Sequence, residues 1–372
     1  MANTFVTIKE IARQALPRLI ENLVFPNLVH RDFSDDFHYL GDTVRVRKPA
    51  VLQAVDFDAQ AGVSYSDIEE SAVDVKLDTI ATVDVAAEAV ETAVNIDDLN
   101  RVFVEPAAAA LAEKINSDGL ALYADIPYFA GAAGTTPAAL GDLAAVRKAL
   151  NLNKVPAAGR VAVWDPEADA AFATIPAIVN AEKSGSVAAL REGAIGRVFG
   201  LDNYMAQGVK RHATGITAAT GVKLSAQAAK GATTLSLTGT SLTGKLVKGD
   251  LIRAGGQTFV VTGDSAAAAS NAIAGVKVYP AVETALAANT VVELIGSHTA
   301  NLAFHPLAFA FVTRPLINPD GEGVASYVTS YNGVSLRVTK GYDQRYKRST
   351  YSMDVLYGFK TVYPELAVRA LG

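Results

Sequence analysis

The sequence contains few residues whose types and spacing could support catalysis. The tripeptide His30-Arg31-Asp32 matches part of a kinase catalytic loop, but the glycine-rich phosphate loop, the strand lysine and the Asp-Phe-Gly metal motif are all missing. Gly244-Lys245 lacks the following Ser or Thr and the upstream spacing of a phosphate-binding loop. No Gly-x-Ser-x-Gly nucleophile elbow is present. We therefore expect no catalytic residues and no cofactor-binding residues, and we predict that the protein is not an enzyme.

The sequence also gives little indication of a metal-binding site. The sequence has no cysteine, which excludes disulfides, thiolate metal sites and cysteine nucleophiles. Neighbouring carboxylates such as Asp35 and Asp36 occur in any acidic protein and carry little information. The histidines show no short metal-ligand spacing; they are His30, His38, His212, His298 and His305. We expect no metal ligands and no cofactor, and a lone histidine such as His305 is more often a packing or capping residue.

Length and charge limit the classes of protein to which the chain can belong. With 372 residues, the chain exceeds the usual size of one compact core, so we expect two or more domains. It has 33 Lys and Arg against 38 Asp and Glu, a net charge of -5, which argues against general nucleic-acid binding. No signal peptide and no apolar stretch long enough to span a bilayer is visible. We expect an intracellular product without a membrane anchor.

The N-terminal segment predicts an amphipathic helix. Thr7 and Glu10 fit a capping box, and Pro17 is expected to kink the helix before it ends near Pro26. Apolar residues follow one helical stripe: Ile8, Ile11, Ala12, Ala15, Leu16, Leu19, Ile20 and Leu23. We expect this arm to pack its apolar face against a partner surface.

The next elements are a long hairpin and several helices. Residues 41–49 and 73–77 alternate apolar and charged side chains, so they predict two strands of an extended hairpin that needs a neighbour to pack against. A long helix is expected from Asp97 to about Leu122, and a shorter one over residues 138–150. Further along we expect a bend at Pro106, a buried strand over residues 160–164, and a helix that begins at Asp165-Pro166.

Residues 214–298 follow a different pattern from the rest of the chain. Short β-rich runs are separated by Gly, Asn, Asp and Ser, which is typical of a small all-β unit. The runs cover residues 222–225, 233–237, 250–254, 257–262, 276–279 and 291–295, with Gly255-Gly256 as a turn. We interpret the block as a compact β-module inserted into an α+β host.

Charge is unevenly distributed. Residues 61–120 are strongly acidic, whereas five cations gather near the C-terminus: Arg337, Lys340, Arg345, Lys347 and Arg348. The basic run could bind a polyanion, but a solvated face or an ion-pair partner for the acidic segment is the favoured interpretation.

Several segments, taken in order, resemble one known family. They are residues 41–49, 191–205, 301–310, 333–337, 342–343 and 358–368. Together they resemble the major capsid (coat) proteins of tailed double-stranded DNA phages, most closely the P22-type coat proteins of short-tailed Salmonella phages, which carry an inserted β-barrel domain. The resemblance spans nearly the whole chain, although each motif alone is weak.

The resemblance implies an α+β fold of the Hong Kong 97 (HK97) type. Its implied divisions are an N-arm (1–40), an E-loop (41–80), a peripheral domain with the spine helix (81–130), a first axial part (131–213), the inserted small all-β barrel domain (214–298), a second axial part (299–345) and C-terminal strands of the peripheral domain (346–372).

The resemblance also implies a function. Many copies would assemble as pentamers and hexamers into an icosahedral shell that encloses double-stranded DNA without sequence-specific binding. Implied partners are the chain itself, a scaffolding protein and a portal protein, with a decoration protein left open and no membrane. The subunit would assemble in the host cytoplasm and reside in the virion capsid. Two alternatives stay open: an encapsulin-like nanocompartment shell, and an adhesive or carbohydrate-binding protein, which the few aromatics of the β-module (Phe259 and Tyr279) make less attractive.

Overall fold

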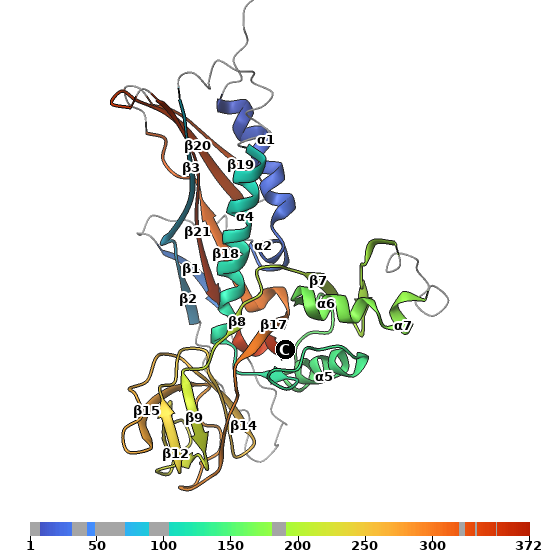
Figure 1. The fold of residues 1–372 in the computed structure, drawn as a ribbon, viewed down its shortest axis with the longest axis vertical. Coiled ribbons are helices and arrows are strands. Elements are labelled where there is room, and N and C mark those ends of the chain that lie inside the picture. The colour runs from blue at the N-terminus through green and yellow to red at the C-terminus, as the bar shows by residue number, and fades with distance from the viewer. Residues whose placement is uncertain are drawn as a thin grey trace, which may run out of the picture. The chain divides into compact units, whose positions relative to one another are not determined.

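A computed structural model describes residues 8–31, 43–48, 71–88, 104–180, 191–319, 324–331, 333–346 and 348–372. The chain divides into two compact units (Figure 1). Unit 1 comprises Met1–Arg18, Arg31–Leu111 and Ala310–Val362, and unit 2 comprises Leu19–His30, Ala112–Phe309 and Tyr363–Gly372. Each unit is therefore built from several separate stretches of sequence.

The two long helices follow the predicted periodicity. Helix α1 spans Ile8–Asn22 and contains Pro17, and the apolar stripe that predicts it is buried at Ile11, Leu16 and Leu19. Helix α4 spans Glu105–Leu120. The predicted start of α4 at Asp97 and the capping residue Thr7 lie outside the described residues.

Unit 1 contains a sheet with the order β18-β21-β20-β19, in which β3 also pairs with β21. The strands are β3 (Thr79–Glu88), β18 (Phe309–Arg314), β19 (Ala325–Tyr331), β20 (Val334–Asp343) and β21 (Arg348–Thr361). Tyr351, Met353, Val355 and Tyr357 alternate along β21 and are all buried, as the two-residue repeat of a strand requires. One face of β21 therefore forms the core of this sheet.

The predicted hairpin is present in unit 1. Strand β1 (Thr43–Lys48) pairs antiparallel with β2 (Ser71–Lys76) and forms a two-stranded sheet. In this register Arg45 lies opposite Asp74, and Arg47 lies opposite Ala72. A two-stranded hairpin is marginally stable alone, so its stability depends on neighbouring structure.

Unit 2 contains a seven-stranded sheet with the order β4-β22-β17-β5-β7-β6, with β8 paired to β17. Its strands are β4 (Phe129–Ala130), β5 (Val161–Trp164), β6 (Arg197–Val198), β7 (Leu201–Met205), β8 (Arg211–His212), β17 (His298–Phe304) and β22 (Ala367–Leu371). Strand β5 pairs parallel with β7, whereas β17 pairs antiparallel with both β5 and β22.

Helices cover this sheet (Figure 1). Leu143 and Val146 of α5 (Leu140–Leu152) and Phe172 of α6 (Pro166–Ala173) join Trp164 of β5 and Val368 of β22 in one buried cluster. The Trp164 and Phe172 rings meet edge to face at 4.9 Å, a favourable aromatic geometry. The short elements of this unit are α2 (Phe25–Leu28), α7 (Pro176–Val179), η3 (Ala121–Asp125), η4 (Pro306–Ala308) and η5 (Pro364–Leu366).

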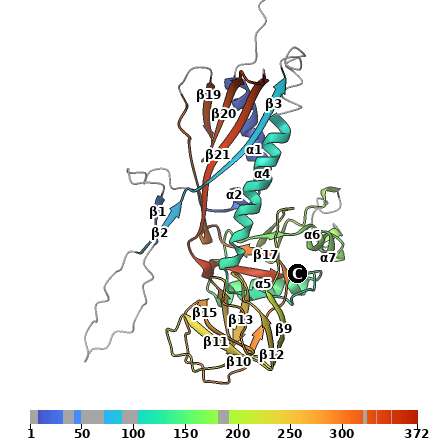
Figure 2. The same cartoon turned by 60° about the vertical axis from the view of Figure 1, so that its left-hand side comes forward.

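Residues 216–294, called the β-rich segment below, also lie in unit 2 (Figure 2). They form a six-stranded sheet, β10-β11-β15-β14-β13-β16, and a separate β9-β12 pair. The strands are β9 (Ile216–Thr220), β10 (Lys223–Leu224), β11 (Thr234–Thr238), β12 (Ser241–Gly244), β13 (Leu251–Ala254), β14 (Gln257–Val261), β15 (Ala272–Tyr279) and β16 (Val292–Leu294). Leu237, Ile252 and Phe259 belong to a core cluster drawn wholly from this segment.

The predicted Gly255-Gly256 turn joins β13 to β14. Both glycines have positive φ, +56° and +80°, as the tight turn of a two-residue hairpin requires. Gly255 also has little space for a side chain, because a Cβ atom there would lie 2.5 Å from Leu286 Cδ2. The β-rich pattern of this segment is therefore confirmed as local structure, while its status as an inserted domain stays a prediction.

The expected divisions stay a prediction, and the strand pairing groups two of the stretches as follows. Strands β18, β19 and β20, expected in the second axial part, lie in the sheet of unit 1, where β18 and β20 pair with β21 and β19 pairs with β20. Strand β22, expected among the peripheral strands, lies in the seven-stranded sheet of unit 2 between β4 and β17. Local pattern cannot reveal this, because an alternating or buried strand is compatible with either sheet until its partners are known.

Candidate functional site: a buried polar junction

The described residues contain no enzyme-like metal centre. No group of three His, Asp or Glu side chains among them could hold a metal ion. Of the helices that the structure describes, none is long and apolar enough to cross a membrane. The feature that stands out chemically is a cluster of buried polar side chains in unit 2, where the β-rich segment meets η3 and the seven-stranded sheet; we call it the junction.

His212 is at the centre of the junction. Its Nε2 lies 2.8 Å from Oδ1 of Asp250, and its Nδ1 lies 3.1 Å from the hydroxyl of Tyr123. The His212 and Asp250 side chains are 4% and 2% exposed, so this contact is shielded from water. Asp250 also accepts a hydrogen bond from Val247 N through its other carboxylate oxygen. Because both Asp250 oxygens are bonded, burial of the carboxylate does not leave it unpaired.

Arg369 links the last strand to the same cluster. Its side chain is fully buried, its Nη1 donates to the carbonyl oxygen of Gly249 at 2.8 Å, and its guanidinium lies 5.1 Å from the ring centroid of Tyr123. Burial lowers the pKa of Arg369 to about 9. Gly249 has a φ of +97°, and a Cβ there would lie 3.2 Å from both Ala124 Cβ and His212 Cε1. A glycine is therefore required where the loop passes between η3 and His212.

His298 completes the buried group. Its ring centroid lies 5.3 Å from that of His212, and the side chain of His298 is almost wholly buried. Burial lowers the pKa of His298 to about 4, an effect that Arg369 and His212 reinforce and the hydrogen bond to Gly296 opposes. Burial likewise raises the pKa of Tyr123. The ring of His298 is therefore neutral over the ordinary pH range.

Further contacts surround the junction. Lys248 of the β-rich segment pairs with Asp125 of η3 at 2.9 Å. The Tyr279 hydroxyl donates a hydrogen bond to Oε1 of Glu365 in η5 at 2.5 Å. Arg253 lies 4.7 Å from the ring centroid of Phe129. Apolar packing accompanies these bonds in a cluster that contains Leu251, Val260 and Leu371.

The sequence did not predict the junction. The spacing of His212 and His298 gives no metal-ligand signal, and neither Asp250 nor Arg369 belongs to a recognisable motif. No local signal could have joined them, because their elements are far apart in the chain. The β8–β17 pairing places His212 opposite His298, the β17–β22 pairing brings in the strand of Arg369, and a side-chain contact joins Asp250 to His212. Gly249 between a lysine and an aspartate is the nearest sequence cue, and it is typical of many turns.

Other predicted residues lie elsewhere. His305 caps η4, where its Nδ1 accepts a hydrogen bond from Leu307 N, as its expected capping role requires. The backbone N–H of His30 donates to the carbonyl oxygens of Pro306 and Phe309. His38 lies outside the described residues. Apart from His212 and His298, the structure does not bring these histidines together into a site.

Four of the five C-terminal cations have local partners, and the fifth, Lys347, lies outside the described residues. Arg337 donates to Oδ2 of Asp354 through Nε at 3.0 Å and Nη2 at 2.6 Å. Lys340 lies over the ring of Tyr351 at 5.3 Å. Two further pairs are Arg348 with Asp343 at 3.6 Å and Arg345 over Tyr346 at 5.4 Å. Among the described residues these partners lie within the C-terminal strands, which favours a locally paired face over a polyanion patch; pairing with the acidic segment of residues 61–120 stays a prediction.

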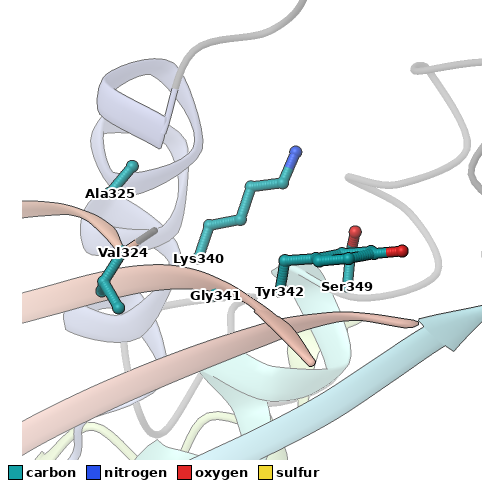
Figure 3. A pocket seen from close by; sticks show the side chains of 6 residues that line it. All are labelled: Val324, Ala325, Lys340, Gly341, Tyr342 and Ser349. Atoms are coloured by element: carbon teal, nitrogen blue, oxygen red, sulfur yellow. The ribbon is translucent and has the colours of Figure 1, made fainter. Parts of the chain in front are cut away.

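A cavity of about 470 Å³ lies where β19 begins, β20 ends and β21 begins. Figure 3 shows Lys340 and Tyr342 rising from the same strand, with Ser349 beside the Tyr342 ring. The residues that line it are Val324, Ala325, Lys340, Gly341, Tyr342 and Ser349. None of these lining side chains is a buried polar group without a partner, so the cavity has no visible ligand-specific chemistry.

Comparison with known proteins gives a consistent answer. The family model described as P22 coat protein, gene protein 5, matches residues 219–372. A solved structure from Mycobacterium phage Che8 is similar at 17% identity and a TM-score of 0.53, covering 94% of this chain and 90% of that one. A structure from Gordonia phage Cozz is similar at 12% identity and a TM-score of 0.46, covering 93% and 85%. Among curated protein sequences, none matches the chain significantly.

These findings confirm the HK97-type fold of a mixed α+β chain, and the family match over residues 219–372 supports a coat protein of tailed phages. They favour a major capsid protein over the two rival interpretations. They also indicate a structural protein, which agrees with the coarser form of the prediction that it is not an enzyme.

Proposed function

We propose that this coat protein assembles as pentamers and hexamers into an icosahedral shell that encloses double-stranded DNA. The observation that carries the proposal is the P22 coat protein match over residues 219–372, on a chain whose described fold is that of phage capsid subunits. We include in the proposal that the subunit has no catalytic role, that it assembles in the host cytoplasm and that a scaffolding protein and a portal protein are its partners. Whether a decoration protein also binds the shell is left open.

The hairpin supports contacts between copies. Strands β1 and β2 form a separate two-stranded sheet, and a hairpin of this kind needs further packing to be stable. A neighbouring subunit in a closed shell would supply that packing. The chain is slightly acidic, with a net charge of -5, which supports a shell wall that encloses DNA without binding a particular sequence.

We keep the expected divisions as part of the proposal. Residues 1–40 act as the N-arm, residues 41–80 as the E-loop and α4 as the spine helix. Residues 214–298 act as an inserted β-domain attached to the rest of unit 2 through the junction. Deleting residues 214–298 with a short linker distinguishes two roles: lower stability of the unassembled subunit indicates a clamp, and altered particle size indicates a determinant of shell geometry.

Sedimentation velocity tests the proposal. The purified subunit, mixed with its scaffolding protein at increasing concentration, is expected to form large closed particles. Persistence as a monomer at high concentration would contradict assembly into a shell. The encapsulin-like alternative is tested on particles from infected or transduced cells, because long double-stranded DNA inside them would exclude a nanocompartment that carries no genome.

A further inference from the structure

The hydrogen bond to Gly296 fixes the tautomer of the neutral His298 ring. Its Nδ1 lies 2.8 Å from the carbonyl oxygen of Gly296, and a carbonyl can only accept, so Nδ1 carries the ring proton. The other nitrogen, Nε2, is buried and has no hydrogen-bond partner among the described residues. Adding a proton to Nε2 would therefore create a buried N–H and a positive charge with no acceptor facing it.

The charges around His298 are nearly balanced while its ring is neutral. Arg369 of β22 carries a positive charge, and Asp250, in the loop before β13, carries a negative one. The other titratable groups that face the junction are His212 of β8, Tyr123 and Asp125 of η3, and Lys248 of the same loop. Lys248 and Asp125 neutralise each other at 2.9 Å. One extra proton thus leaves an unbalanced positive charge in a site shielded from water, close to Arg369.

We propose that protonation of His298 loosens the attachment of the β-rich segment to η3 and β22, so that the junction acts as an acid-sensitive latch. The bonds at risk are those that cross the junction. They include the hydrogen bond from Arg369 to Gly249 and the contact between His212 and Asp250. Opening brings the ring of His298 into water, where its charged form is stable. The core of the β-rich segment is separate from the junction, so the segment itself stays folded.

The direction of the pH effect follows from the two pKa values. The opened ring has the ordinary value near 6.5, and the closed ring has a value of about 4. Between these values the open state binds a proton that the closed state does not, so closure is fully stable above about pH 6.5 and weakens as pH falls towards 4. Acidification from about pH 7 to about pH 5 should weaken closure about 20-fold.

Hydrogen exchange on the unassembled subunit tests the latch. Peptides covering residues 245–252 and 365–372 are followed at about pH 7 and about pH 5, with rates corrected for the intrinsic pH dependence of exchange. In the unmodified protein we expect protection of both segments to fall about 20-fold, while peptides from the core of the β-rich segment change little. The His298→Gln variant, whose amide can still donate to Gly296, should lose most of this pH dependence.

His305→Gln is the matched control, because His305 follows the opposite end of β17 and lies outside the junction. It should behave like the unmodified protein. Equal loss of protection in the His298→Gln variant and the unmodified protein would overturn the proposal. If His298→Gln does not fold, the imidazole titration of His298 is measured by NMR in the unmodified subunit, and titration near 6.5 with both segments still protected would overturn it. Neither measurement requires assembly, so the latch and the shell proposal can fail separately.

Discussion

Arg369 Nη1 donates a hydrogen bond to the carbonyl oxygen of Gly249 at 2.8 Å, which joins the last strand of the chain to the loop before β13. The guanidinium is fully buried, and it lies over the ring of Tyr123. Removing this charge from water is costly, and because Nε and Nη2 have no hydrogen-bond partner among the described residues, the cost is offset by the bond to Gly249 and the contact with the Tyr123 ring. The contact therefore marks where the β-rich segment is fixed within unit 2.

Replacing Arg369 with Met should destabilise the subunit. The substitution keeps much of the apolar volume but removes the bond to Gly249 and the positive charge beside Asp250. We expect a loss of roughly 2–4 kcal/mol in the free energy of unfolding. Urea unfolding followed by circular dichroism measures the change. Arg211→Met, at an exposed position of β8, is the control and should shift the free energy by less than about 0.5 kcal/mol; equal effects of the two variants would refute the role of Arg369.

Asn116 ties α4 to the turn after α1 within unit 2. Its Oδ1 accepts hydrogen bonds from Val24 N at 3.0 Å and Phe25 N at 3.2 Å, and its Nδ2 donates to Asn22 O at 3.0 Å. Asn116→Ala removes all three, and we expect a loss of roughly 1–3 kcal/mol, measured by thermal or urea unfolding. The exposed Asn22→Ala variant keeps its backbone carbonyl and should be nearly unchanged; a large effect at Asn22 and none at Asn116 would contradict this account.

Tyr279 should make the subunit sensitive to alkali. Burial, helped by the hydrogen bond to Glu365, raises the pKa of Tyr279 above its ordinary value of 10. The unfolded chain loses the phenolic proton first, so the stability from Tyr279 is complete below about pH 10 and falls as pH rises above it. Urea midpoints between about pH 8 and about pH 11 should fall less steeply in Tyr279→Phe than in the unmodified protein. The exposed Tyr204→Phe variant should keep the original slope; identical slopes in all three proteins would rule out this role.

Charge reversal at the hairpin should affect assembly more than folding. Arg45 and Arg47 lie on β1, opposite Asp74 and Ala72, at the base of the proposed E-loop. For Arg45→Glu or Arg47→Glu we expect little particle formation, while the thermal midpoint of the unassembled subunit changes by less than about 2 °C. Sedimentation and differential scanning calorimetry measure the two effects. Arg314→Glu, exposed in the same unit, is the control; a loss of subunit stability as large as the loss of assembly would argue against an inter-subunit role.

The sequence predicts elements with strong local patterns. The stripe through Ile11 and Leu19 predicts α1, the alternation of residues 43–48 predicts β1, and Gly255-Gly256 predicts the β13–β14 turn. These predictions succeed because periodicity and turn chemistry depend on neighbouring residues. The whole-chain resemblance then supplied the fold, which the Che8 structure supports at only 17% identity.

The partners of each strand were not predictable in the same way. The sequence of β22 is compatible with a buried strand in the sheet of unit 1 or in the seven-stranded sheet of unit 2. Only its pairing with β4 and β17 places it in unit 2. The junction depends on that placement, because Arg369 reaches Gly249 only from β22. Contacts between distant segments depend on the assembled fold, so a single sequence does not encode them as a local signal.

Electron microscopy of the assembled product tests the central claim most directly. The chain is produced with its scaffolding protein, and the particles are reconstructed with and without imposed symmetry. We predict closed icosahedral shells in which this subunit forms both pentamers and hexamers. Monomers, small open oligomers or particles without five-fold vertices would contradict the assignment as a major capsid protein.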